Sequence, residues 1–314
     1  MKYENVTITG IGSYLPPKVV TNADIVKDVD TTDEWIYTKL GIRERRVADN
    51  ESVSEMGTKA ARKALLDANL DKEDIDLIIV ATSSPEQISP ATACAIHRKL
   101  GIKKNVPSYD INAVCSGFLY AISLSAPLVS VGAYKNVLII ATEAYSNITN
   151  WKARHCVFFG DGAGAVVLGP AEKGWMGGTI VANGSGTGPT GFVARLDEPF
   201  EMVGKEVWDQ AAAVLPDSIR EVLNSYSLKA EDITMLVPHQ PSINILKLVA
   251  KEVGLPMEKV KTVMHKYANI AAASIPIALD EAIKKREINW GDKILLTAIG
   301  SGWAWGTMVV NYER

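Results

Sequence analysis

The order of apolar and polar positions repeats itself in two distant parts of the chain. Residues 62–80 read RKALLDANLDKEDIDLIIV and residues 220–238 read REVLNSYSLKAEDITMLVP, a match at an offset of 158 residues. Each stretch predicts an amphipathic helix, a short polar link and a buried strand. The same offset carries Cys115 to Ala273, and in both places a polar turn leads into a helix rich in small residues. The apolar runs NVLIIATEA and KILLTAIGSG also correspond.

These matches predict an α/β protein made of two similar halves, residues 1–170 and residues 171–314. The alternative explanation is that any two helix-strand units look alike. The helices after Cys115 and Asn269 carry small residues where a surface helix would carry charge, so we expect both to be buried and packed against each other. The turns before them would then meet near the centre of the molecule. Strand-to-helix turns are where ligands bind in open α/β folds.

The composition is that of an ordinary water-soluble protein, with 47% hydrophobic and 22% charged residues. The net charge of -3 argues against a nucleic-acid-binding protein, which normally carries a basic excess. No apolar run is long enough to span a bilayer, and the N-terminal MKYENVTITGIG lacks the apolar core of a signal peptide. We therefore expect a cytoplasmic protein with neither nucleic acid nor membrane among its partners.

The cysteines and histidines do not form a metal-binding pattern. Three cysteines and four histidines are scattered without a CxxC or Cys/His ligand spacing, so we expect no metal site. An odd number of cysteines in a chain of this length is typical of reduced thiols in the cytosol. Any site that uses them must be assembled by the fold.

Three polar residues on predicted turns form a candidate catalytic set. Cys115, in INAVCSGFLYAI, precedes a helix whose free N–H groups and dipole are expected to lower the pKa of the thiol. His239 follows the apolar run ITMLVP, and Asn269 lies on the corresponding turn further on. Each also has a purely structural interpretation, as a packed core thiol or as a residue beside a helix start. Together they suit a nucleophile with two polarising partners.

Two glycine-rich stretches give weaker signals. FFGDGAGAVVLG, residues 158–169, has neither GxGxxG nor GxxxxGK, so it predicts a tight turn between strands and not a phosphate loop. AIGSGWAWGTMVV, residues 298–310, has glycines that would let another group come close to the backbone. These glycines would form either a hairpin turn or a turn that supplies a backbone N–H group to an oxyanion hole.

Six motifs then follow one another in the order of a known family. They are GIGSYLPPKVVTNADI, TTDEWIYTKLGIRERRVAD, FGDGAGAVVL, VPHQ, YANIAAASIPIALDEA and GSGWAWGTMVV. The whole chain resembles β-ketoacyl-acyl-carrier-protein synthase III of the thiolase superfamily. The resemblance implies a thiolase-like fold with duplicated α/β halves, layered α-β-α-β-α around buried central helices. It also implies a homodimer.

The resemblance implies a decarboxylative Claisen condensation that uses no cofactor beyond its CoA thioester substrates. Cys115 matches the nucleophile that takes an acyl group from acyl-CoA. His239 and Asn269 match the pair that binds the second substrate, a malonyl thioester on a carrier protein or on CoA. The backbone N–H groups of Cys115 and Gly302 are the implied oxyanion hole. The product would be a β-ketoacyl thioester.

The substrate-binding positions depart from the family pattern in several places. Trp35, Lys39 and Arg154 align with positions that hold the CoA adenine and phosphates, but the family usually has arginine where this chain has Lys39. Lys205 stands where asparagine is usual. Where the family reads A-N-x-R after His-Gln, this chain reads residues 241–244 as Pro-Ser-Ile-Asn, which places Ser242 at the asparagine position. The cationic surface expected to meet an acidic carrier protein is thinned, which should slow association more than chemistry.

Other functions stay open at this stage. One alternative is a specialised acyltransferase that moves an acyl group to an oxygen, nitrogen or carbon acceptor without initiating fatty acids. A non-catalytic partner subunit would lack the cysteine, so the presence of the full Cys/His/Asn set counts against it. A hydroxymethylglutaryl-type synthase would need a glutamate on the loop before the cysteine. Glu86 is the candidate, but its surroundings do not fit that pattern.

Overall fold

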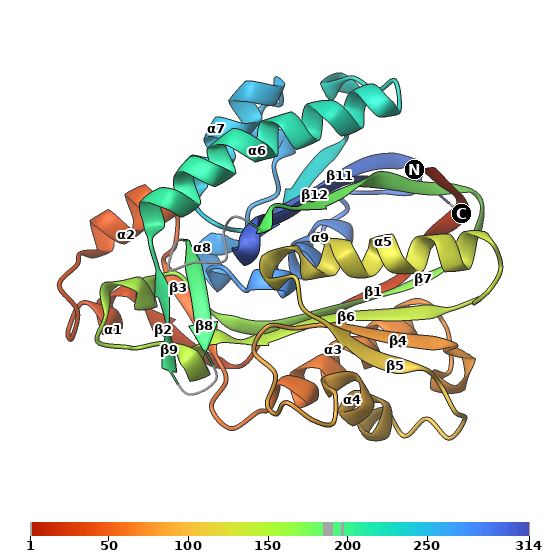
Figure 1. Ribbon diagram of the computed structural model, residues 1–314, viewed down its shortest axis with the longest axis horizontal. Coiled ribbons are helices and arrows are strands. Elements are labelled where there is room, and N and C mark those ends of the chain that lie inside the picture. The colour runs from red at the N-terminus through yellow and green to blue at the C-terminus, as the bar shows by residue number, and fades with distance from the viewer. Residues whose placement is uncertain (1, 185–190, 196–197, 314) are drawn as a thin grey trace.

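The computed structural model describes residues 2–184, 191–195 and 198–313 (Figure 1). Within those residues, one sheet of eight strands runs in the order β10-β11-β12-β7-β6-β4-β5, and β1 also pairs with β7. The strands are β1 (Lys2–Tyr14), β4 (Leu77–Ala81), β5 (Ser108–Ile111), β6 (Val137–Ala144), β7 (Asp161–Ala182), β10 (Met235–Pro238), β11 (Asp292–Gly300) and β12 (Ala304–Tyr312). Two small hairpin sheets pair β2 (Lys18–Thr21) with β3 (Glu44–Val47) and β8 (Phe192–Arg195) with β9 (Glu198–Met202).

The helices form three layers, and parts of the sheet lie between the layers. The helices are α1 (Asn22–Ile25), α2 (Asp33–Leu40), α3 (Val53–Asp67), α4 (Thr92–Leu100), α5 (Gly117–Ser130), α6 (Gly204–Ser225), α7 (Ile243–Val253), α8 (Met264–Tyr267) and α9 (Ser274–Lys284). Figure 1 shows α5 and α9 in the middle, α3 and α4 below them, and α6 and α7 above. The predicted thiolase-like layering with buried central helices is confirmed. No helix in the described part of the chain has the length and apolar character needed to cross a bilayer.

The strands are apolar without interruption because both of their faces are buried. On β4, Leu77 and Ile79 pack toward the central helices, while Ile78 and Val80 pack toward α3 and α4. On β11, Leu296 belongs to the central cluster and Leu295 to the cluster beneath α6 and α7. Continuous apolar runs of this kind are the usual mark of strands that helices cover on both sides.

The sequence repeat corresponds to a repeated structure. Arg62 of α3 donates to the backbone carbonyl of Lys99 near the end of α4, and Arg220 of α6 donates to the carbonyl of Glu252 near the end of α7. In the same way β4 pairs with β6 in parallel and β10 pairs with β11 in parallel. The two halves therefore share helix contacts and strand pairing as well as sequence.

The repeat shortens by one residue before the central helices. Short 3-10 turns, η2 (Val114–Ser116) and η8 (Ala271–Ala273), precede α5 and α9. Val114 and Ala271 both hold left-handed backbone angles, with φ of 48° and 41°. The counterpart of Cys115 is therefore Ala272, and the expected match to Ala273 is wrong.

The glycine-rich stretch 158–169 is not a turn, so that prediction is also wrong. Most of it forms the start of β7, which pairs with β6 and β1 and later with β12. A Cβ atom at Gly164 would lie 2.7 Å from Pro276 of α9, so glycine here lets the central helix approach the strand. β7 also runs through residue 170, where the boundary between halves is predicted, and that boundary stays a prediction.

Candidate active site

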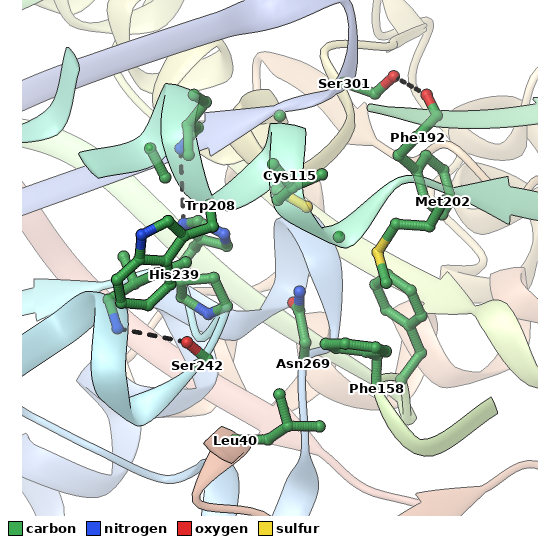
Figure 2. Close-up of a pocket in the computed structure, with 18 of the residues that line it drawn as sticks. Leu40, Cys115, Phe158, Phe192, Met202, Trp208, His239, Ser242, Asn269 and Ser301 are labelled. Carbon is green, nitrogen blue, oxygen red and sulfur yellow. Dashed lines mark hydrogen bonds between the residues drawn. The ribbon is translucent and has the colours of Figure 1, made fainter. Parts of the chain in front are cut away.

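A cavity of about 460 Å³ brings the predicted catalytic set together. Cys115 lies in η2 immediately before α5, His239 follows β10, and Asn269 lies between α8 and η8. All three side chains line the cavity and are buried, with exposed fractions of 8%, 3% and 5%. Figure 2 shows them converging on one space, with Trp208, Ser242 and Leu40 also at its edge.

The turn that holds Cys115 is strained and tightly packed. Val114 is β-branched, and its φ of 48° is a conformation that such residues rarely adopt. A Cβ atom at Gly300 would lie 3.0 Å from the backbone nitrogen of Cys115 and 2.7 Å from the carbonyl oxygen of Ala113. The end of β11 therefore presses against the turn, and strain of this kind is found where a fold fixes a reactive group.

The thiol of Cys115 does not have the depressed pKa that its position before a helix predicts. Burial, with a smaller contribution from the nearby Glu143 carboxylate, raises the pKa of the thiol to about 12. The correction has a structural reason, because α5 begins at Gly117 and the sulfur sits in an apolar chamber. At pH 7 the thiol is therefore protonated in nearly every molecule.

His239 is held as a neutral hydrogen-bond donor. Its Nδ1 accepts the backbone N–H of Ile299 at 3.5 Å, which leaves the ring proton on Nε2. Burial lowers the pKa of His239 to about 3, so the ring is uncharged at neutral pH.

The Asn269 amide is oriented in a similar way. Its Oδ1 accepts the N–H of Ala271 at 2.9 Å and the hydroxyl of Ser274 at 3.3 Å. The Nδ2 group is therefore left to donate, and the Asn269 side chain lowers the pKa of the nearby Cys115 thiol. With His239, it provides two N–H donors beside the nucleophile.

A buried glutamate behind the cysteine was missed by sequence reasoning. Glu143, at the end of β6, is fully buried and accepts hydrogen bonds from the hydroxyl of Ser84 at 2.5 Å and the N–H of Ser83 at 3.1 Å. Burial raises the pKa of Glu143 to about 7. The only available signal was an acidic residue at the end of the apolar run NVLIIATEA.

The predicted substrate-binding residues divide into two groups. Trp35, Lys39 and Ser242 line the cavity. Arg154 is not among the described lining residues, but its guanidinium lies 4.3 Å from the Trp35 ring centroid, a cation–π distance. Lys205 is exposed, pairs with Asp209 and does not line the cavity in the described structure.

The turn after β11 provides different lining residues from those expected. In the described structure Gly300 and Ser301 line the cavity and Gly302 does not. Gly302 has a φ of 73°, which the hairpin between β11 and β12 requires at that position. The Ser301 hydroxyl donates to the carbonyl of Phe192 and ties the turn to β8 (Figure 2).

The chain's departures from the family pattern have structural uses. Ser242 caps α7 by accepting the N–H of Ile245 at 3.3 Å. Asn244 donates to the carbonyl oxygen of Lys39 at 3.1 Å and so joins α7 to α2 at the cavity mouth.

The remaining lining residues are mostly apolar, and apart from Pro241 and Asn244 the sequence analysis did not name them. They are Leu40, Val114, Tyr145, Phe158, Phe159, Phe192, Met202, Gly204, Val207, Trp208, Ala211, Pro241, Asn244, Ile245, Ile299 and Trp303. Most come from elements far apart in the chain, and only the fold brings them together.

A buried cysteine with neutral histidine and asparagine donors, set where two duplicated α/β halves meet, defines a condensing acyltransferase of the thiolase-like class. Two family models match the chain: the 3-oxoacyl-[acyl-carrier-protein] synthase III model over residues 109–184 and its C-terminal model over residues 223–312. The chain belongs to the 3-oxoacyl-[acyl-carrier-protein] synthase III family.

Individual relatives agree over nearly the whole length. The β-ketoacyl-[acyl-carrier-protein] synthase III of Caldanaerobacter subterraneus is 43% identical, with 98% of each chain covered. The crystal structure of the synthase III from Aquifex aeolicus superposes with a TM-score of 0.95 at 42% identity, covering 98% of this chain and 100% of that one. The priming β-ketosynthase of the R1128 polyketide pathway superposes with a TM-score of 0.93 at 31% identity, covering 98% and 96%.

Proposed function

We propose that the protein joins an acyl group from acyl-CoA to a malonyl thioester by decarboxylative condensation, through an acyl-Cys115 intermediate. The observation that carries the proposal is the pair of N–H donors, His239 Nε2 and Asn269 Nδ2, fixed beside the Cys115 sulfur in a buried cavity. CoA thioesters are its substrates, and we expect no metal or other cofactor.

The first step transfers the acyl group to the enzyme. The Cys115 sulfur forms a bond to the acyl carbonyl carbon, the bond from that carbon to the CoA sulfur breaks, and the thiol proton leaves with CoA. Because the raised pKa of Cys115 leaves little free thiolate, the thiol must lose its proton in the same encounter in which it accepts the acyl group. The N–H of Cys115 and an N–H from the turn at residues 300–302 would stabilise the tetrahedral oxyanion.

The second step forms the carbon–carbon bond. The malonyl carboxylate leaves as CO₂, and its bonding electrons pass to an enolate whose oxygen accepts from His239 and Asn269. The enolate carbon attacks the acyl-Cys115 carbonyl, and the released thiolate takes a proton from solvent. The largely apolar lining favours this step, since a charged carboxylate is lost as a neutral gas in a place with little water.

The cavity mouth suits a CoA or phosphopantetheine thioester. The Trp35 ring stacked against Arg154 offers a flat face for adenine with a cation beside it, and Lys39 adds a second cation. Lys247 and Lys251 are exposed on α7 and could meet an acidic carrier protein. Lys205 stays a predicted contact, although its pairing with Asp209 must be broken first.

A homodimer is part of the proposal. In the described structure β5 is the last strand of the sheet at one end, and its Tyr109 side chain is exposed. An uncovered edge strand is a natural place for a second copy to pair. A cytoplasmic location is expected as well.

A specialised acyltransferase remains the second candidate. It is favoured by the departures at residues 241–244, which lie at the mouth where an acceptor would enter. That enzyme would need acyl-Cys115 but no malonyl decarboxylation.

Intact-protein mass spectrometry with a panel of acyl-CoAs tests the first step, with Cys115→Ala as the control. Malonyl-CoA and malonyl carrier protein are then added to the acylated enzyme in separate tubes. The proposal predicts an adduct on the natural chain alone, and its disappearance with formation of a β-ketoacyl product. An adduct that both malonyl thioesters leave intact would favour the specialised acyltransferase, and the absence of any adduct would contradict both.

A further inference from the structure

Four aromatic rings gather beside the Cys115 sulfur. Tyr145 follows β6, Phe159 precedes β7, Phe192 lies on β8 and Phe200 on β9. They form one buried apolar cluster with Cys115, and we call these four side chains the ring wall. In Figure 2 Phe192 and Met202 lie on the other side of Cys115 from His239 and Trp208.

The rings of the wall touch one another. Tyr145 and Phe159 are stacked with centroids 4.6 Å apart, Phe192 and Phe200 are 5.0 Å apart, and Phe159 meets Phe200 edge-on at 5.1 Å. Centroid separations of this size are direct ring contact. An acyl chain cannot pass between rings at these distances unless one of them moves.

Tyr145 is the ring that is held most firmly. Its side chain is fully buried, and its hydroxyl hydrogen-bonds the Ser83 hydroxyl at 2.7 Å. The Ser83 hydroxyl in turn donates to the Glu143 carboxylate at 2.9 Å, which makes Tyr145 the donor in the first bond. Moving the Tyr145 ring would leave buried polar groups without partners, which is strongly unfavourable.

We propose that the ring wall limits the acyl group on Cys115 to one the size of acetyl or propionyl, and that Tyr145 is the residue that determines this limit. The inference deepens the proposed function and rests on it, because it concerns the acyl-Cys115 intermediate. Trp35 and Lys39, which line the same cavity, are separate from the ring wall, so the wall limits the acyl group without blocking the residues proposed to hold CoA.

The test compares the rates at which acetyl-, butyryl- and hexanoyl-CoA acylate Cys115, measured by intact mass under identical conditions. We expect acetyl-CoA to react at least about 100-fold faster than hexanoyl-CoA, since each misfitting methylene in a closed pocket is worth roughly 10–200-fold. Tyr145→Leu removes one ring face and should shrink that ratio at least about 10-fold. Tyr145→Phe keeps the ring and should retain the preference. Tyr226→Leu, at a ring tilted against Trp175 and outside the cavity lining, is the matched control and should leave the rate ratio unchanged.

Each outcome has a separate meaning. Acylation of the natural chain by none of the three thioesters would contradict the proposed function itself. Equal rates with acetyl- and hexanoyl-CoA would overturn the ring wall while leaving the proposed function standing. An unchanged ratio in folded Tyr145→Leu would overturn the role of Tyr145. If that variant does not fold, Phe192→Leu opens the same wall from β8 and takes its place.

Discussion

Asn269 offers the sharpest test of how the site stabilises an enolate. Asn269→Ala removes one of two N–H donors facing the cavity, while His239 and the Cys115 turn stay in place. Both donors are more than nine-tenths buried, so water is poorly placed to replace the lost one. Deleting one donor of an oxyanion site typically lowers the rate 10²- to 10³-fold, about 2.7–4 kcal/mol.

The assay follows two reactions on the same variant. Decarboxylation of malonyl-CoA, measured as CO₂ release, should fall by about 10²- to 10³-fold. Acylation of Cys115 by acetyl-CoA should change far less, because that step uses backbone donors. Loss of the Asn269 oxygen also leaves the Ala271 N–H without its acceptor, so unfolding free energy should fall by about 1–3 kcal/mol. The thermal unfolding of Asn269→Ala is therefore measured alongside its kinetics.

Ser274→Ala is the matched control, since it removes a hydroxyl that orients Asn269 but leaves the amide donor present. Its decarboxylation rate should lie within about tenfold of that of the natural chain. Equal losses of decarboxylation and acylation in Asn269→Ala, or no loss of either, would refute the assignment of Asn269 as an enolate donor.

Three further predictions follow from the buried groups of the site. The pKa of His239 is lowered to about 3, so as the pH falls the unfolded chain takes up a proton on this residue before the folded chain does. The unfolding free energy from urea titrations should therefore fall by about 2 kcal/mol from pH 6.5 to pH 5, and this fall should be absent in His239→Gln. Gly300→Ala places a Cβ atom 3.0 Å from the Cys115 nitrogen and should slow acylation about 100-fold in a quenched time course followed by intact mass. Gly132→Ala, which adds a Cβ to open space after α5 and away from the cavity lining, should leave the acylation rate unchanged. Iodoacetamide at pH 7.5 should label exposed Cys94 well before Cys115 in peptide maps, and labelling in the reverse order would contradict the raised thiol pKa.

The repeat and the short motifs predicted the layers of the fold and the three residues that meet in the cavity. Cys115 and His239 come after β5 and β10, and strand ends converge in this architecture. Asn269 instead follows the short helix α8, so the strand-to-helix turn predicted for it is wrong. The pKa of Cys115 could not be predicted in the same way. It depends on burial by rings from separate segments of the chain, whereas the local sequence shows only the helix that follows.

Other errors have the same origin in long-range packing. The glycines of residues 158–169 suggested a turn, but Gly164 makes room for Pro276, a residue that belongs to the other half of the chain. Glu143 lies in the run NVLIIATEA, which the sequence pattern identifies only as a buried strand. Its hydrogen bonds with Ser83 and Ser84 show that it belongs to a buried polar network. The role of Gly302 as an oxyanion-hole donor stays a prediction, and the folded turn presents Gly300 and Ser301 to the cavity beside it.

A single-turnover reaction tests the central claim most directly. Enzyme acetylated on Cys115 and freed of CoA is mixed with malonyl carrier protein, or with malonyl-CoA in a parallel tube, and the adduct, CO₂ and thioester product are measured together. The account predicts that one acetyl adduct is lost for each CO₂ released and each acetoacetyl thioester formed. CO₂ release with the adduct left intact, or loss of the adduct to water without a β-ketoacyl product, would contradict it.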